Sequence, residues 1–166
     1  MIGLTERIEP VTQDRHILRL DGADELLSRV GSRLGVSAWH EVAQRDIDVF
    51  ADATGDHQWI HVDPHLAAAG SFGTTIAHGL YTLSRGPSLN NEIVEIVGFS
   101  AALNYGFEKV RFPAPLPVSS RFRMAADLLS AAAVPGGIQI VIRQTFERDG
   151  ELKPVCVADA VSRWLF

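Results

Sequence analysis

The pattern of hydrophobic and polar residues divides the chain into a helical first part and a strand-like second part. Up to about residue 100, apolar residues recur three and four positions apart, which is the period of an amphipathic helix. Beyond that point apolar and polar residues alternate, and turns separate the alternating segments. These segments are "NYGFEKVRF", "SSRFRMAADLLS", "GIQIVIRQTFER" and "KPVCVADAVSRWLF". Helices followed by turn-linked strands predict an α+β fold, with an antiparallel sheet and helix packed on one face.

The first expected helix lies in "GADELLSRVGSRLG", and the segment "SAWHEVAQ" after it has the pattern of a short strand. Gly35 can end this helix. Its apolar residues at helical spacing are Leu26, Leu27, Val30 and Leu34. A helix that precedes the main strands in this way predicts a helical start to the chain.

Two more short helices, "RDIDVFADATG" and "DPHLAAAG", have recognisable ends. In the first, Asp46 fits the N-cap and Gly55 can take the left-handed conformation that ends a helix. In the second, Asp63 fits the N-cap and Gly70 fits the end. Pro64 suits the first helical position, because the N–H that proline lacks would have no partner there.

A long helix is expected in "GTTIAHGLYTLSRGPSLNNEIVEIVG". Its buried stripe would consist of Ile76, Leu80 and Leu83. The pair Gly86–Pro87 should kink or end the helix, because proline removes a backbone donor and crowds the preceding turn.

Composition and charge then exclude several classes of protein. The 166 residues suit one domain, and 46% hydrophobic with 21% charged residues is typical of a soluble globular protein. The net charge of −5, with dispersed Lys and Arg, argues against nucleic acid as a partner. The apolar runs are too short for membrane insertion, and "MIGLTERIEP" does not resemble a secretory signal, so we expect a cytoplasmic protein. The single cysteine, Cys156, is expected to be a buried apolar residue rather than a nucleophile.

The segment "ATGDHQWIHVDP" places an acid and a histidine five residues apart, at Asp56 and His61. If Gly55 ends a helix, the carboxylate of Asp56 lies just past the negative end of the helix dipole. Partial burial near Trp59 would act in the same direction, so we expect a raised pKa for Asp56, as a general base needs near neutral pH. His61 is expected in a non-helical segment that folds back toward the acid. The two side chains could then hold one water molecule as an acid/base pair.

Such a short motif has two other interpretations. Asp56 can be a turn residue and His61 a core histidine with satisfied hydrogen bonds, which is the more frequent case for an isolated Asp-x4-His. A metal site is the second alternative, because His57, His61, Asp63 and His65 lie close together in the sequence. Their spacing matches no established ligand set, and Asp63 is better explained as a helix cap, so we expect no metal.

The segment "TTIAHGL" adds a candidate for charge stabilisation. Thr74 or Thr75 can cap the long helix, which puts His78 and Gly79 in or near its first turn. The first N–H groups of a helix have no acceptor within it and point at any negative charge placed there. Because Gly79 has no side chain, a ligand carbonyl can approach its backbone closely, and its N–H can stabilise an oxyanion. Alternatively, Gly79 only permits close helix packing.

Together these segments resemble the MaoC-like family, the (R)-specific enoyl-CoA hydratases of the hot-dog fold. The family pattern is a helix ending in Gly-Asp, a His a few residues later, an Asp-Pro helix, and "AHG" opening the central helix. Here it reads "TGDHQWIHVDPHLAAAGSFGTTIAHG", followed by the strand "VRFPAPLPV". The resemblance covers about residues 37–166 as a single hot-dog domain, most similar to the nodulation protein N-like members. It leaves residues 1–36 as a helical N-terminal extension.

The resemblance implies a curved antiparallel β-sheet wrapped around a long central α-helix, paired into a homodimer. It implies reversible syn addition of water to trans-2-enoyl-CoA, with Asp56 and His61 as the acid/base pair and the Gly79 N–H polarising the thioester carbonyl. We expect Asp56 to take the proton of the water, and His61 to orient that water or return a proton. No metal or redox cofactor is implied. The partner is an acyl-CoA or acyl-carrier thioester, with coenzyme A as part of the substrate.

The resemblance also suggests residues that contact the substrate, namely Gln58, Trp59, His78, Lys109 and Arg111. Lys109 and Arg111 lie on one face of an expected strand and could meet the phosphates of coenzyme A, although a solvated strand face is the more frequent role. Trp59 could line an acyl tunnel or anchor its loop in the core.

The chain departs from the family pattern at two places. Gln58-Trp59 replaces the usual Asn-Pro, which keeps an amide but loses the rigidity of proline, so the loop and the acyl-chain shape can differ. Ser119–Ser120 replaces the Gly-Asp that often follows the "PxPV" turn, which weakens the match in that strand.

Two other functions remain open at this point. Hot-dog thioesterases share the fold, and fold alone does not decide the chemistry. The altered Gln58-Trp59 segment would also suit an acyl-thioester binding module without catalytic activity. The Asp-x4-His pair together with "AHG" favours the hydratase.

Overall fold

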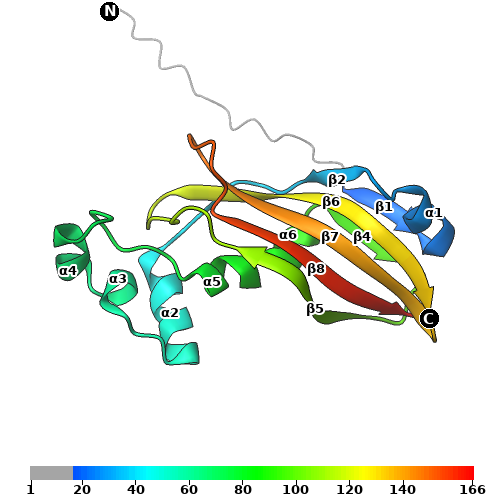
Figure 1. Ribbon diagram of the computed structural model, residues 1–166, viewed down its shortest axis with the longest axis horizontal. Coiled ribbons are helices and arrows are strands. Elements are labelled where there is room, and N and C mark those ends of the chain that lie inside the picture. Colours follow the sequence, from blue (N-terminus) through cyan, green and yellow to red (C-terminus); the bar gives the residue numbers. More distant parts are fainter. Residues whose placement is uncertain (1–16) are drawn as a thin grey trace, which may run out of the picture.

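The computed structural model describes residues 17–166, so residues 1–16 of the predicted extension lie outside the described residues. The main sheet consists of β2 (Arg33–Val36), β3 (His40–Glu41), β5 (Ala101–Arg111), β6 (Arg121–Val134), β7 (Gly137–Arg148) and β8 (Cys156–Leu165). All of its pairings are antiparallel, in the order β2-β6-β7-β8-β5 with β3 along β6. Figure 1 shows this sheet curving past α5 (Gly79–Ser84) and α6 (Gly86–Asn90), the arrangement expected of an α+β hot-dog fold.

The four strands predicted beyond residue 100 are confirmed, and their side chains alternate between the two faces of the sheet. Along β7, Ile138, Ile140 and Ile142 belong to the core, whereas Arg143 is exposed. This alternation is the period-two pattern of a strand with one buried face. Cys156 at the start of β8 is fully buried, as expected, and burial raises the pKa of its thiol to about 12.

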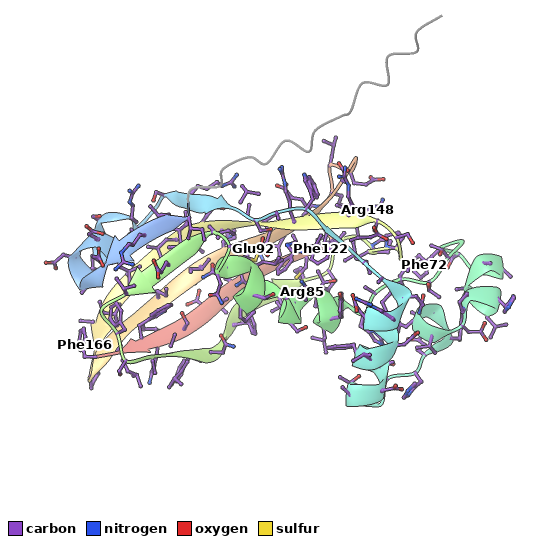
Figure 2. All side chains as sticks on the ribbon, turned by 180° about the vertical axis from the view of Figure 1, so that it is seen from behind. Phe72, Arg85, Glu92, Phe122, Arg148 and Phe166 are labelled. Carbon is purple, nitrogen blue, oxygen red and sulfur yellow. The ribbon has the colours of Figure 1, made fainter. Side chains whose placement is uncertain are left out.

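The helix expected in residues 73–98 is shorter than predicted and consists of two short helices, α5 and α6. The chain breaks between α5 and α6 at Arg85, directly before the Gly86–Pro87 pair that was expected to interrupt the helix. Figure 2 shows Arg85 near this break, and its guanidinium lies 5.9 Å from the centre of the Phe122 ring on β6. The first helix begins only at Gly79, with His78 at its N-cap.

Neither Thr74 nor Thr75 caps a helix, because the segment around them is extended. It pairs with residues 116–118 through an isolated bridge and through the N–H of Ala77, which donates to the carbonyl of Leu116 at 2.8 Å. These backbone hydrogen bonds replace those that a longer helix would have made.

The predicted buried stripe of this helix is only partly correct. Ile76 and Leu83 are buried, but Leu80 is 61% exposed. Because α5 starts later than expected, Leu80 falls in its first turn, on the side that faces away from the core.

The segment Val94–Val97, predicted as helix, forms strand β4 instead. It pairs in parallel with β1 (Leu18–Asp21) in a separate two-stranded sheet. The sequence "VEIV" is rich in β-branched residues, which favour strands, so this local preference overrides the helical spacing.

The first predicted helix is shorter than expected. The helix α1 comprises Gly22–Ser28 and buries Leu26, whereas Leu34 and Gly35 lie in β2. Residues 18–36 nonetheless pack on the same core as the rest, since Leu20 and Leu26 belong to the main cluster of buried side chains. The predicted domain division at residue 36 stays a prediction. Within residues 17–166, no helix is both long and apolar enough to cross a membrane.

Helix α2 (Gln44–Thr54) ends as predicted, at Gly55 with a φ of 78°. Its buried residues are Ile47 and Ala51. The predicted N-cap is wrong: Asp46 lies inside the helix, and Ala43 occupies the cap position with an extended backbone. The left-handed turn at Gly55 directs the chain out of the helix directly before Asp56.

Two short helices follow, α3 (Trp59–Val62) and α4 (Pro64–Ala69). Asp63 caps α4 as predicted, because its Oδ1 accepts the N–H groups of His65 and Leu66 at 3.0 Å each. His61 lies in α3 rather than in a non-helical segment as predicted. Figure 1 shows α2, α3 and α4 grouped beyond one end of the main sheet, next to the start of α5.

Ser119 has a φ of 62°, which makes it the one non-glycine residue with positive φ in the described part of the chain. Its position is the one where the family pattern often has glycine. A side chain in this left-handed conformation costs roughly 1–2 kcal/mol. Ser119, which replaces the glycine of the family pattern, therefore adds backbone strain to the folded chain.

Candidate active site

Asp56, His61 and His78 converge on one point. A carboxylate oxygen of Asp56 and one ring nitrogen from each histidine all lie within 4.8 Å of one another. Asp56 follows the end of α2, His61 lies in α3, and His78 is the N-cap of α5. Three elements therefore bring the predicted acid and histidine together, and add a second histidine from the "AHG" segment.

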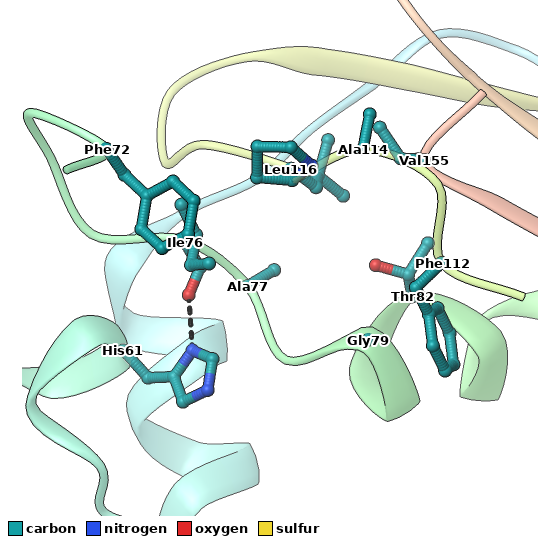
Figure 3. Close-up of a pocket in the computed structure, with 11 residues that line it drawn as sticks. His61, Phe72, Ile76, Ala77, Gly79, Thr82, Phe112, Ala114, Leu116 and Val155 are labelled. Atoms are coloured by element: carbon teal, nitrogen blue, oxygen red, sulfur yellow. Dashed lines mark hydrogen bonds between the residues drawn. The ribbon is translucent and has the colours of Figure 1, made fainter. Parts of the chain in front are cut away.

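The ring of His61 has one defined proton position. Its Nδ1 lies 2.7 Å from the carbonyl oxygen of Ile76, so Nδ1 carries the proton and donates it (Figure 3). Burial lowers the pKa of His61 below its ordinary 6.5; the Ile76 carbonyl opposes this, and the neighbouring His78 adds to it. His61 is therefore neutral near pH 7, and the lone pair on its Nε2 is free to accept a hydrogen bond.

His78 contacts both Asp56 and His61. Its Nε2–H donates to the backbone carbonyl of Asp56 at 2.9 Å, and its ring stacks on His61 with centroids 3.7 Å apart. The ring of Phe50 contacts it at 5.0 Å between centroids. The Nδ1 of His78 is buried and has no hydrogen-bond partner among residues 17–166. Stacking and the hydrogen bond together fix the loop that carries Asp56.

The carboxylate of Asp56 is open to solvent. Asp56 is exposed, so the expected partial burial beside Trp59 is wrong for the single chain. One of its oxygens accepts a long hydrogen bond of 3.4 Å from the N–H of Gln58. Its place just past the end of α2 is as predicted.

Asp56, His61, His78 and Gly79 line one cavity of about 360 Å³, which we call the catalytic cavity. Gly79 is the first residue of α5, so its N–H has no acceptor within the helix. The cavity therefore brings together two acceptors for a water molecule and one donor for an oxyanion.

A second cavity of about 290 Å³, which we call the apolar cavity, shares His61, Gly79 and Phe112 with the first. The ring of Phe112 lies directly against Gly79 (Figure 3), and a Cβ added to Gly79 would be 2.9 Å from its Cγ and Cδ1. Glycine is thus required here for packing. The close approach of Phe112 leaves no space for a side chain at the first residue of α5.

Gln58 and Trp59 do not line either of these cavities. Gln58 is exposed at the N-cap of α3. The ring of Trp59 lies against Gly70, where an added Cβ would be 2.9 Å from it. In the single chain Trp59 therefore packs α3 onto the end of α4, while 41% of it stays exposed.

Lys109 and Arg111 lie on the face of β5 that points away from the helices. Together with Arg143 and Asp159 they line a separate cavity of about 340 Å³. Arg143 donates two hydrogen bonds to Asp159, at 2.7 and 2.9 Å, and thereby lowers the pKa of that carboxyl. The structure does not bring Lys109 or Arg111 to the catalytic cavity, although Arg111 directly precedes Phe112.

The four residues considered as metal ligands from the sequence do not form a site. His57 pairs with Asp52 at 2.9 Å, Asp63 caps α4, and His65 is exposed. Each of these side chains except His61 has a role or position outside the catalytic cavity.

Asp56, His61 and His78 have the spacing of a metal site but not its orientation. A divalent ion binds an imidazole nitrogen near the plane of the ring. The two rings are stacked 3.7 Å apart with planes inclined by 25°, so one ion cannot lie close to both planes at bonding distance. We therefore interpret the cluster as an acid/base site.

Sequence reasoning missed two contributors to this site. The carbonyl of Ile76 sets the proton position of His61, and the ring of Phe112 covers Gly79. A backbone carbonyl leaves no signal in the residue pattern, and an aromatic residue at the end of a strand is usually a packing residue. Only the position of Phe112 directly after β5, opposite "AHG", could have indicated its role.

Comparison with known proteins gives a consistent family match. The MaoC like domain family matches residues 25–143. 3-Hydroxyacyl-thioester dehydratase Z of Mycobacterium tuberculosis is 46% identical over 142 residues, which cover 85% of this chain and 94% of that protein. Nodulation protein N of Rhizobium leguminosarum bv. viciae is 42% identical over 139 residues, covering 81% of this chain and 86% of that protein.

Solved structures confirm the hot-dog fold. The R-hydratase PhaJ1 from Pseudomonas aeruginosa superposes with a TM-score of 0.67 at 20% identity, covering 82% of this chain and 81% of that one. The (R)-hydratase from A. caviae superposes with a TM-score of 0.65 at 19% identity, covering 80% and 94%. At these identities the likeness concerns the fold.

Proposed function

This chain belongs to the MaoC-like domain family, and from that premise we propose that Asp56 and His61 add water reversibly to trans-2-enoyl thioesters. The chain is a hydro-lyase of the hydratase/dehydratase type. The observation that carries the assignment of residues is the catalytic cavity, which Asp56, His61 and Gly79 line together.

In the proposed reaction, one water molecule lies between Asp56 and His61. The carboxylate of Asp56 and the Nε2 of neutral His61 are both acceptors, so they take the two hydrogens of the water and leave an oxygen lone pair for C3. Asp56 accepts a proton as the O–C3 bond forms, and the π electrons of C2=C3 move toward C2 and the thioester oxygen. Asp56 then gives the proton to C2. Because one group serves both steps, hydrogen and hydroxyl add to the same face.

The N–H of Gly79 supports the intermediate in this proposal. Negative charge develops on the thioester oxygen when C3 is attacked, and a preorganised donor there lowers the barrier. Gly79 offers the first N–H of α5, and His78 beside it keeps the start of that helix next to Asp56. Dehydration of the 3-hydroxyacyl thioester runs through the same contacts in reverse.

The proposed substrate is an acyl thioester of coenzyme A or of an acyl carrier protein. Asp56 supplies the proton transfers and His61 orients the water, so the proposal includes no metal and no redox cofactor. Lys109 and Arg111 remain proposed contacts for the phosphates of coenzyme A, since Arg111 directly precedes Phe112 at the edge of the catalytic cavity. His78 is a proposed substrate contact from within that cavity. A cytoplasmic location is part of the proposal.

We also propose that two copies pair along β5. This strand is the last in the sheet, and within residues 17–166 no strand covers its outer edge. Its residues Leu103, Tyr105 and Phe107 are each about half exposed, from 48% to 59%. An apolar, unpaired edge strand favours association with another strand. A second copy of the same strand would cover it symmetrically.

Crotonyl-CoA and the purified protein suffice to test the function. We expect the absorbance of the conjugated enoyl thioester to fall without release of free thiol, and the product to be the (R)-3-hydroxyacyl-CoA. Thiol release without hydration would indicate a thioesterase instead. Binding of the thioester with neither reaction would indicate a binding module.

A further inference from the structure

A series of cavities leads from the catalytic cavity along α5 and α6. Leu80 lines the catalytic cavity and also the next one, of about 330 Å³, which we call the middle cavity. The middle cavity shares Pro87, Phe107 and Gln144 with a third cavity of about 330 Å³, which we call the end cavity. Leu80, which is 61% exposed, borders two of these adjoining cavities, and we call the series of three between the helices and β5 the groove.

The distance along this groove matches an acyl chain of medium length. Gly79 and Gly86 are seven residues apart in the sequence, which corresponds to about 10 Å along helical backbone. Gly86 lies against Gln144, where an added Cβ would be 2.6 Å from the Oε1 of the amide. Gly79 lines the catalytic cavity and Gln144 lines the middle and end cavities, so the amide lies farther along the groove than the proposed carbonyl site.

The far end of the groove carries polar amide groups. Gln144 is only 7% exposed and lines both the middle and the end cavity, so its side-chain amide borders the groove. The Oδ1 of Asn90, which lines the end cavity, is buried without a partner in the described part of the chain. Buried amide groups without partners are rare, because leaving them unpaired is unfavourable. A fully apolar acyl chain would offer neither group a partner.

We propose that this enzyme acts on enoyl thioesters whose acyl chain carries a hydroxyl near its distal end, bound by Gln144 and Asn90. A hydroxyl can accept from the amide of Gln144 and donate to the Oδ1 of Asn90, whereas a keto oxygen can only accept. A carboxylate is disfavoured, because neither Lys nor Arg lines the middle or end cavity, and Glu95 adds a negative charge there. This inference rests on the proposed function, since the groove begins at the catalytic cavity.

The test compares trans-2-decenoyl-CoA with its ω-hydroxy derivative. For the wild-type protein we expect kcat/KM to be about tenfold higher for the hydroxylated substrate, the effect of one net hydrogen bond. In Gln144→Leu this preference should disappear, mainly through KM for the hydroxylated substrate. The matched control is Gln139→Leu on the same strand, whose side chain accepts from Arg163, away from the groove. It should keep the preference of the wild type.

A thermal melt distinguishes whether Gln144 binds the substrate or stabilises the fold. If it binds the substrate, the melting temperature of Gln144→Leu should equal or exceed that of the wild type, whereas a structural role would lower it. Equal kcat/KM for the two substrates in the wild type, with crotonyl-CoA turned over, would overturn the inference and leave the proposed function intact. Absence of hydration with all three substrates would overturn the proposed function itself.

Discussion

The ring of His78 stacks on the ring of His61 at 3.7 Å between centroids, while its Nε2–H holds the backbone carbonyl of Asp56. One side chain thus determines the position of both proposed catalytic groups. Stacking also disfavours a positive charge on His61, because the two rings would repel each other when protonated. His78 is therefore a positioning residue, and it adds to the burial that lowers the pKa of His61.

Loss of either member of the pair should abolish most activity. We expect Asp56→Asn and His61→Ala each to lower kcat/KM for hydration by roughly 10²–10⁴-fold, the usual contribution of a positioned acid or base. Asp56→Asn should keep the melting temperature of the wild type within a few degrees, since Asp56 is exposed. His61→Ala should lower it, because His61 is buried and its Nδ1–H is the partner of the Ile76 carbonyl. Enoyl absorbance and thermal melts are the measurements.

The matched controls for this pair are Asp52→Asn and His65→Ala. Both residues are exposed and lie outside the catalytic cavity, within a few positions of the proposed pair. Their hydration rates should equal that of the wild type. Turnover near the wild-type rate in Asp56→Asn would contradict the mechanism.

Activity should decrease in acid through the protonation of His61. Burial lowers the pKa of His61 below 6.5, so its Nε2 is a free acceptor at neutral pH and loses that role once protonated. We expect kcat/KM to fall as the pH decreases, with a midpoint below 6.5. A pH profile with crotonyl-CoA measures this, and a midpoint above the ordinary value for histidine would contradict the assignment.

The free energy of unfolding should also depend on the protonation of His61. The folded pKa of His61 lies below the unfolded one, so between the two values the unfolded chain binds more protons. The free energy of unfolding should therefore decrease as the pH falls through that window, and become independent of His61 below it. In His61→Ala this part of the pH dependence should be absent from urea titrations.

Gly79→Ala should impair catalysis through Phe112. The added Cβ would be 2.9 Å from the ring, so the ring or the start of α5 must move. We expect kcat/KM to fall on the order of 10²-fold, as for a small displacement of a reacting group. The double variant Gly79→Ala/Phe112→Ala should regain part of this loss relative to Gly79→Ala. Simple additivity of the two changes would show that Phe112 does not transmit the effect.

Ser119→Gly should stabilise the protein. Glycine removes the strain of a left-handed conformation but adds freedom to the unfolded chain, which leaves a gain of about 0.5–1 kcal/mol in the free energy of unfolding. Ser119→Ala keeps the strain and should give no gain. Urea denaturation of the three proteins distinguishes these outcomes, and equal stability of the glycine and alanine variants would refute the role of strain.

A charge on β5 should weaken the proposed dimer. Leu103 is 50% exposed on the edge strand, and Leu103→Lys should place a desolvated charge in the interface. We expect sedimentation to show dissociation at concentrations at which the wild type is dimeric. Leu27→Lys changes a leucine of similar exposure, 43%, on α1 and should not affect assembly. Equal dissociation of both variants would argue against pairing through β5.

The residue pattern predicted the sheet better than the helices. The strands beyond residue 100 were recognised from alternating and β-branched residues, a pattern that is local to each strand. The central helix is shorter than predicted because parts of its segment pair elsewhere: residues 75–77 pair with residues 116–118, and Val94–Val97 pairs with β1. The pairing of residues 75–77 is not visible in their own segment, whereas the β-branched residues of Val94–Val97 give a local preference for strand.

The part of the candidate site that could be predicted consists of residues whose type and spacing indicate acid/base chemistry. Asp56, His61 and Gly79 line one cavity, as the motif "TGDHQWIHVDP" with "AHG" indicated. The stacking of His78, the cover over Gly79 and the position of the Gln144 amide beside the groove depend on contacts between elements far apart in the chain. No pattern in one segment encodes those contacts.

The proton on His61 is held by a main-chain oxygen, that of Ile76, rather than by a side chain. Substitutions at position 76 change the side chain but leave that acceptor in place. A substitution of Ile76 therefore leaves the proton of the proposed catalytic imidazole on Nδ1. Relatives of this protein can diverge at this position and keep the same form of the ring.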